Sequence, residues 1–174
     1  MYFNIFDNYS IRNYIPKGKN SILIRILEPS YNINGIPYKI DTIKLYKNIL
    51  ELYIFDTINK SNDDDSKYIF NNGHAKILND FIVNNEFDEV VIHCSLGISR
   101  SPAIMICIAK ILGNSILENL IKEKYKFYNL HIVDVFEKYN YNLKKIDYIS
   151  IIDGNILDEK KSDKCNHILQ KIIK

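Results

Sequence analysis

The sequence predicts an α/β domain with a central, mostly parallel twisted sheet that is covered on both faces and flanked by helices. Short β-branched runs alternate with longer amphipathic or apolar segments, a pattern typical of a parallel sheet. The chain has 174 residues, enough for one domain with a sizeable core and too few for two ordinary ones. We therefore expect one domain over 1–174, with a core at about 21–139, an N-terminal arm at 1–20 and a C-terminal extension at 140–174.

Three core segments are expected to form strands, because each is a short apolar run between turn residues. They are residues 21–27, which Pro29 ends, residues 49–55 and residues 89–92. The first twenty residues are polar and aromatic without a clear period, so we expect an irregular arm with at most one short strand. A further strand-like run lies at 148–152.

The helices are predicted from apolar spacing and from their end signals. Residues 72–83 carry apolar side chains at helical spacing, and residues 101–112 are almost wholly apolar. Gly113 is placed to end the second of these helices, and Ser115 with Glu118 forms the S-x-x-E pattern of a capping box. The other predicted helices are 115–127, 130–139 and a short C-terminal one around Ile168 to Ile173.

The overall charge points to no polyanionic or membrane partner. The formal net charge is +2 and charged residues make up 25% of the chain, so no basic or acidic excess indicates a nucleic acid or a membrane surface. No apolar run approaches the length of about 18 residues that a membrane span needs. We expect a cytoplasmic protein.

The cysteines are few and unpaired in sequence. Cys94, Cys107 and Cys165 are odd in number and form no CxxC pair, which argues against a disulfide framework and against a zinc site. We therefore expect free thiols and neither a metal nor another cofactor.

Residues 93–101 read His-Cys-Ser-Leu-Gly-Ile-Ser-Arg-Ser, and they join the strand predicted at 89–92 to the helix predicted at 101–112. A loop at this position ends at a helix N-terminus, where backbone N–H groups have no intrahelical partner and carry partial positive charge. Such a loop is suited to bind an oxyanion.

The residue types in this loop fit phosphoryl transfer. The loop N–H groups, the helix dipole and Arg100 all favour the thiolate of Cys94, which is the nucleophilic form. Arg100 offers a planar fork that can hold two phosphoryl oxygens, in a chain whose only other arginines are Arg12 and Arg25. Gly97 gives the backbone freedom for a tight curl, and we expect the Ser101 hydroxyl to donate to Cys94.

The stretch His-Cys-x5-Arg-Ser resembles the signature of the protein tyrosine phosphatase superfamily, and its ending Gly-Ile-Ser-Arg-Ser-Pro looks most like the dual-specificity branch. The resemblance implies the cysteine-dependent phosphatase fold, a metal-independent reaction through a phosphocysteine intermediate, and a phosphorylated protein as substrate. It makes Cys94 the nucleophile, gives Ser101 a part in its release, and makes Arg100 a phosphate ligand. The remaining phosphate-binding positions are Ser95, Leu96, Gly97, Ile98 and Ser99.

The family mechanism also needs a carboxylic acid, and two places in the sequence could supply it. Asp56 ends a predicted strand 38 residues before Cys94, while Asp63, Asp64 and Asp65 lie 31 to 29 residues before it. Both spacings fit dual-specificity members. We favour Asp56, because a strand end fixes a side chain better than a polar run does.

Two alternatives belong to other functional classes. One is an RNA 5′-phosphatase of the same fold, and the other is a catalytically weak module that only binds phosphate. The loop lacks the Lys residues with which phosphoinositide-specific relatives meet extra phosphates, so a lipid substrate is less expected. Larger tyrosine-specific members carry a Trp-Pro-Asp segment, and this chain contains no Trp.

Overall fold

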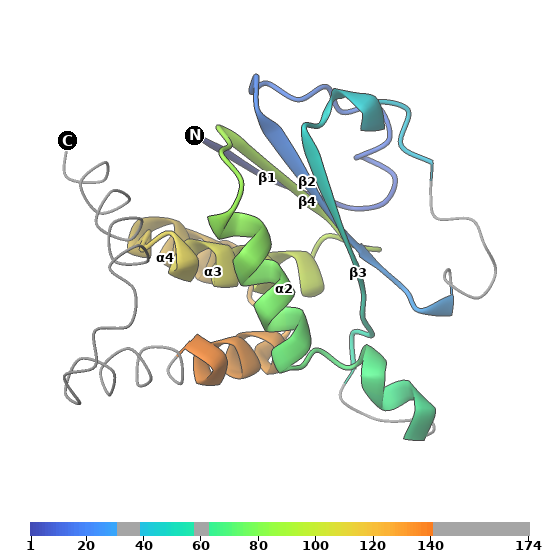
Figure 1. Cartoon of the computed structure of the whole chain (residues 1–174), viewed down its shortest axis with the longest axis vertical. Helices are drawn as coiled ribbons and strands as arrows, with labels where there is room; N and C mark the ends of the chain where they lie inside the picture. Colours follow the sequence, from blue (N-terminus) through green and yellow to red (C-terminus); the bar gives the residue numbers. More distant parts are fainter. Residues whose placement is uncertain (31–38, 58–62, 141–174) are drawn as a thin grey trace, which may run out of the picture. The chain divides into compact units, whose positions relative to one another are not determined.

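A computed structural model of the chain describes residues 1–30, 39–57 and 63–140 (Figure 1). Its described part contains one sheet of four strands in the order β1-β4-β2-β3. All three neighbouring pairs are parallel, which confirms the predicted α/β class and parallel sheet. The strands are β1 (Tyr2–Phe6), β2 (Ser21–Leu27), β3 (Asn48–Tyr53) and β4 (Glu89–His93). The strand expected at 148–152 and the C-terminal helix lie outside the described residues.

Strand β1 lies in the segment that we expected to be an irregular arm. It pairs with β4 along its whole length, from Tyr2 opposite Glu89 to Phe6 opposite His93. Its side chains only partly alternate between apolar and polar types, so the sequence pattern gave a weak signal. The pairing partner, far along the chain, is what makes this segment a strand. The sheet therefore begins before residue 21.

All the described α-helices lie on one side of the sheet, as Figure 1 shows for the green, yellow and orange ribbons. Alternate residues Ile22, Ile24 and Ile26 of β2 point into this core. The central helix α3 buries nearly every side chain, because it lies between the sheet and the other helices. The helices are α2 (Asn72–Val83), α3 (Arg100–Ile111), α4 (Ser115–Lys124) and an unlabelled helix over residues 130–140.

In the described part of the chain, the opposite face of the sheet is covered by connecting segments rather than by α-helices. Leu23 and Val91 on this face contact Ile11, Ile40 and Tyr46, which belong to connecting segments without an α-helix. Among the described residues this face carries only the short 3-10 helix η1 (Ile43–Leu45). These connections hold isolated apolar side chains, enough to seal the sheet but without the repeating apolar stripe of a helix.

Helix α4 begins with a different cap from the predicted one. The side chain of Asn114 accepts a hydrogen bond from Leu117 N at 3.0 Å, and Ser115 is already helical. Glu118 makes ion pairs with Lys110 and Lys122 at 2.7 and 2.6 Å instead of closing a capping box. Gly113 does end the preceding turn, with a φ of 65°. The helix ends at Lys124, earlier than the predicted residue 127.

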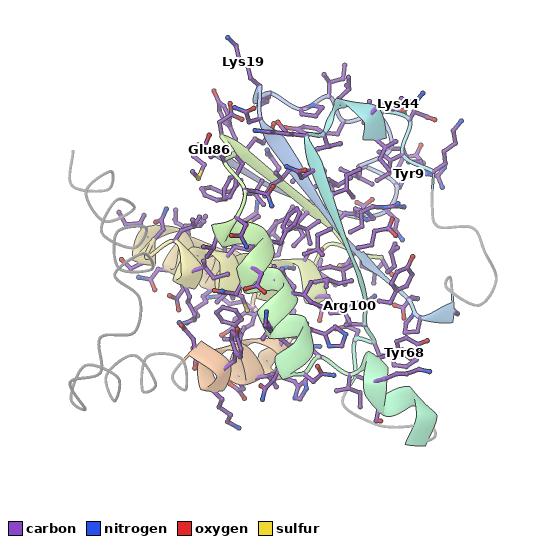
Figure 2. All side chains as sticks on the ribbon, viewed as in Figure 1. Tyr9, Lys19, Lys44, Tyr68, Glu86 and Arg100 are labelled. Atoms are coloured by element: carbon purple, nitrogen blue, oxygen red, sulfur yellow. The ribbon has the colours of Figure 1, made fainter. Side chains whose placement is uncertain are left out.

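The carboxyl ends of β2, β3 and β4 meet at one edge of the sheet, because the three strands are parallel neighbours. Glu28 follows β2, Asp56 lies three residues beyond β3, and Cys94 follows β4. Figure 2 labels Arg100 beside the end of β3. None of the helices in the described part of the chain is long and apolar enough to cross a membrane.

Candidate active site

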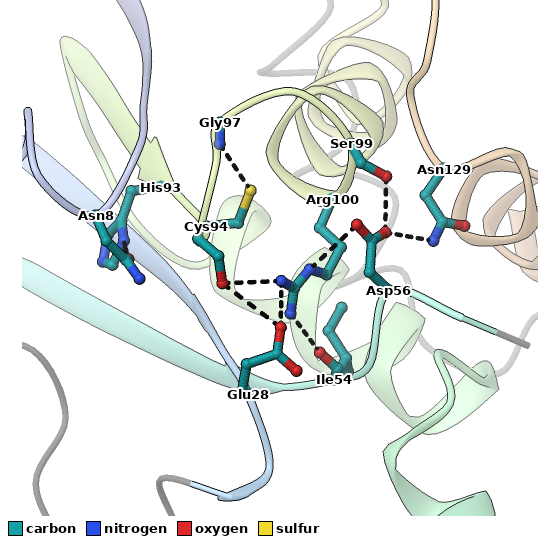
Figure 3. A network of polar contacts seen from close by, with 11 residues as sticks. Asn8, Glu28, Ile54, Asp56, His93, Cys94, Gly97, Ser99, Arg100 and Asn129 are labelled. Carbon is teal, nitrogen blue, oxygen red and sulfur yellow. Dashed lines mark hydrogen bonds and ion pairs between the residues drawn. The ribbon is translucent and has the colours of Figure 1, made fainter. Parts of the chain in front are cut away.

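The loop between β4 and α3 places Cys94 in the interior. The residue is 2% exposed, and its Sγ accepts a hydrogen bond from Gly97 N at 3.2 Å, shown as a dashed line in Figure 3. In the described residues, four amide N–H groups of this loop have no hydrogen-bond partner, which leaves them available to an oxyanion. They belong to Ser95, Leu96, Ile98 and Ser99.

Helix α3 is left uncapped at the end that faces this loop. Ser99 occupies its N-cap position, where a Ser hydroxyl ordinarily accepts a hydrogen bond from the first turn, but no such bond is formed. The Ser99 hydroxyl instead donates to Asp56 Oδ1 at 2.7 Å. The positive end of the α3 dipole is therefore not neutralised by its own cap.

Gly97 lets the loop lie against the end of β1. Its φ is +70°, in the left-handed region, and a Cβ built on it would be 2.9 Å from Asp7 N and from the Phe6 carbonyl group. The curl of the loop thus needs glycine both for backbone conformation and for space.

Asn8 holds the residues on either side of the nucleophile. Its backbone N–H donates to Ser95 O at 3.2 Å, and its side-chain Oδ1 lies 2.9 Å from His93 Nδ1. An amide oxygen can only accept, so this contact is a hydrogen bond in the tautomer that carries the proton on Nδ1. The segment after β1 is therefore part of the wall that supports Cys94.

The guanidinium group of Arg100 is buried and held on two edges. Its NH1 donates to Ile54 O at 2.9 Å and its NH2 to Ser95 Oγ at 3.0 Å, and NH2 also forms an ion pair with Glu28 Oε1. The side chain is 4% exposed. Its Nε has no hydrogen-bond partner among the described residues. The contacts of NH1 and NH2 thus fix the plane of the guanidinium group, and they leave Nε without a hydrogen bond.

Asp56 is brought to the same place by β3. Its Oδ1 accepts hydrogen bonds from Ser99 Oγ at 2.7 Å and from Asn129 Nδ2 at 2.9 Å, while its Oδ2 lies 3.9 Å from Arg100 Nε (Figure 3). The carboxylate is 41% exposed, so it stands at the rim above a buried Arg. The other candidate acids, Asp63 to Asp65, begin the 3-10 helix η2 (Asp63–Tyr68), and their side chains lie outside the described part.

Ser101 does not make the contact expected of it. The residue is fully buried in the first turn of α3, and its Oγ has no hydrogen-bond partner among the described residues. The expected hydrogen bond from Ser101 to Cys94 is therefore absent, and the donor to Cys94 Sγ is Gly97 N.

Burial shifts the pKa of His93 and of Cys107 away from their ordinary values. Desolvation, assisted by the positive charge of Arg25 and opposed by Asp7, lowers the pKa of His93 to about 3, so its ring is neutral near pH 7. Desolvation also raises the pKa of Cys107 in α3, and its thiol stays protonated. Cys107 is therefore not a candidate nucleophile.

Sequence reasoning missed three residues of this site: Glu28, Asn8 and Asn129. Glu28 had a usable signal, because it directly follows a strand whose neighbours in the sheet end at Asp56 and Cys94. The two asparagines had none, since each reaches the site only through tertiary contacts. Among the described residues, no group of three or more His, Cys, Asp or Glu side chains is arranged to hold a metal ion.

Comparison with known proteins gives one structural match to report. No family model and no curated protein matches the chain. Among solved structures, the chain is similar to the human tyrosine phosphatase-like serine/threonine/tyrosine-interacting protein, with a TM-score of 0.46 and 20% identity. The match covers 72% of this chain and 79% of the other. A likeness of this extent says nothing about activity.

Proposed function

We propose that this protein is a cysteine-dependent phosphomonoester hydrolase that removes phosphate from tyrosine and from serine or threonine side chains of proteins. The observation that carries the proposal is the buried Arg100 beside a loop that begins with Cys94 and has four N–H groups without a hydrogen-bond partner among the described residues. Arg100 forms an ion pair with Glu28, but its Nε has no hydrogen-bond partner among the described residues, and a buried donor without a partner is costly. A phosphoryl group in the curl of the loop would accept from this Nε and from the loop N–H groups.

The proposed reaction has two steps. Cys94 Sγ attacks phosphorus, the S–P bond forms as the P–O ester bond breaks, and Asp56 gives its proton to the leaving oxygen. Asp56 then takes a proton from water, whose oxygen bonds to phosphorus as the S–P bond breaks. Arg100 and the unpaired loop N–H groups hold the three equatorial oxygens in both steps. A part for Ser101 in thiolate release stays a prediction.

The rim of the site supports a protein substrate over a polyanionic RNA end. Leu96 and Ile98 of the loop are 71% and 50% exposed, and Phe127 and Leu130 beside Asn129 are 83% and 63% exposed. The two segments are adjacent, because Asn129 N donates to Ser99 O at 3.2 Å. Exposed apolar side chains suit the residues of a peptide and offer no charge to further phosphates.

The nucleophile is tested by Cys94→Ser, with Cys107→Ala as the matched control at an inert thiol. We expect hydrolysis of an aryl phosphate and of a phosphotyrosyl peptide to be lost in the first variant, because serine has no accessible anionic form, and to persist in the second. The assay is run with a chelator present. Turnover that survives Cys94→Ser would refute the proposal. Faster release of phosphate from triphosphate-ended RNA than from the phosphopeptide would favour the RNA alternative.

A further inference from the structure

Asn129 makes three hydrogen bonds at the junction between the site and the following helix. Its backbone N–H donates to Ser99 O at 3.2 Å, and its Nδ2 donates to Asp56 Oδ1 at 2.9 Å. Its Oδ1 accepts from Ile132 N at 3.2 Å and so caps the helix over residues 130–140. One side chain therefore ties the first turn of a helix to the carboxylate of Asp56.

The carboxylate of Asp56 needs this support because it stands at the rim. Its side chain is 41% exposed, and a short exposed carboxylate can rotate towards solvent. Ser99 and Asn129 both donate to Oδ1, and neither donates to Oδ2. The two donors thus distinguish the oxygens of one carboxylate, and Oδ2 is the one that faces Arg100 Nε at 3.9 Å.

We propose that Asn129 is a positioning residue that holds Oδ1 of Asp56 so that the transferred proton always resides on Oδ2. This inference rests on the proposed function. With the proton on Oδ2, Oδ1 is a carbonyl oxygen that still accepts from Nδ2 and from Ser99 Oγ. After Oδ2 has given its proton to the leaving oxygen, the same two bonds remain. Asp56 can therefore act as acid in the first step and as base in the second without turning.

The test uses aryl phosphates with good and poor leaving groups, because only a poor leaving group needs a proton as the P–O bond breaks. For Asp56→Asn we expect kcat/KM, which reports the first step alone, to fall about 100-fold with the poor leaving group and far less with the good one. For Asn129→Ala, kcat/KM should fall about tenfold with the poor leaving group and less than about threefold with the good one. Inhibition by inorganic phosphate should stay unchanged in Asn129→Ala, since Arg100 and the loop are intact.

Asn129→Ser separates positioning from folding. Serine is as good a helix cap as asparagine, so the helix over 130–140 keeps its cap, but the amide donor to Asp56 is lost and no charge is added beside the carboxylate. We expect a melting temperature close to that of the unaltered protein together with the same selective loss with the poor leaving group. The double variant Asp56→Asn/Asn129→Ala should be no slower than Asp56→Asn, because Asn129 acts only through Asp56.

The outcomes distinguish this inference from the proposed function. Hydrolysis that survives Cys94→Ser removes the proposed function itself. If Cys94 is required but Asp56→Asn loses equally with both leaving groups, Asp56 is not the acid, and the inference falls with it. If Asp56→Asn behaves as expected, two results overturn the inference. One is that both Asn129 variants hydrolyse the poor substrate as fast as the unaltered protein does. The other is that the fold-loss of the double variant equals the product of the fold-losses of the two single variants.

Discussion

At the scale of the residue, Gly97 and Gly113 share a backbone conformation but differ in surroundings. Their φ values are +70° and +65°, in the region that disfavours a side chain. A Cβ at Gly97 would lie 2.9 Å from the backbone of Phe6 and Asp7, whereas a Cβ at Gly113 would meet nothing within 4 Å. The comparison isolates the contact between the loop and β1.

Gly113→Ala should lower the free energy of unfolding by about 1 kcal/mol, the cost of left-handed strain alone. Gly97→Ala should cost at least twice as much, because backbone atoms of β1 cannot move as a flexible side chain can, and should also lower kcat/KM. Urea denaturation of both variants gives the two values. Equal losses would show that the loop does not need the close approach to β1.

At the scale of the element, α3 differs from the other described α-helices because its N-terminus has no side-chain cap. Asn71, Asn114 and Asn129 cap α2, α4 and the helix over 130–140 through their side chains. Ser99 caps nothing, since its hydroxyl is bonded to Asp56. Each of the described α-helices other than α3 thus has a side-chain cap for at least one of its first-turn N–H groups, whereas the first turn of α3 has none.

The cap of α4 can be tested by two adjacent substitutions. Asn114→Ala removes the acceptor for Leu117 N and should lower the free energy of unfolding by about 1 kcal/mol. Ser115→Ala should change it by less than about 0.5 kcal/mol, because Ser115 is an exposed residue inside the helix. Thermal or urea denaturation measures both losses. A larger loss for Ser115→Ala than for Asn114→Ala would support the cap predicted from the S-x-x-E pattern.

At the scale of the whole molecule, two buried groups couple folding to pH. Glu89 is fully buried at the start of β4. Burial alone would raise its pKa, but hydrogen bonds from Ser21, Tyr14 and the backbone N–H groups of Gly18 and Lys17 lower it. Its contribution to stability is present above the usual carboxyl pKa and is lost as the pH falls below it.

His93 also makes the folded protein less stable as the pH falls, and its effect begins at a higher pH than that of Glu89. Its pKa is about 3 in the folded protein, and an unfolded histidine titrates near 6.5. Between these values the unfolded chain binds the extra proton, so we expect the free energy of unfolding to fall by up to about 1.4 kcal/mol for each pH unit below 6.5. Urea denaturation at pH 7, 6 and 5 measures the slope.

NMR titration identifies the group responsible for that slope. The ring signals of His93 should not shift between pH 7.5 and about 4.5 in the folded protein, and should titrate near 6.5 in concentrated urea. A midpoint near 6.5 in the folded state would contradict the neutral, buried ring.

The sequence by itself determined the parallel α/β class, strand β2 and helices α2 and α3 to within a residue or two. It also determined where Cys94 and Arg100 stand relative to a helix N-terminus. These features depend on local periodicity and on a loop whose neighbours in sequence are also its neighbours in space. Tertiary structure alone decided that β1 joins the sheet and that Gly97 touches it. It also decided that Glu28 meets Arg100 and that Asn129 holds Asp56. Those contacts join residues far apart along the chain, whose local patterns carry no mark of their partners.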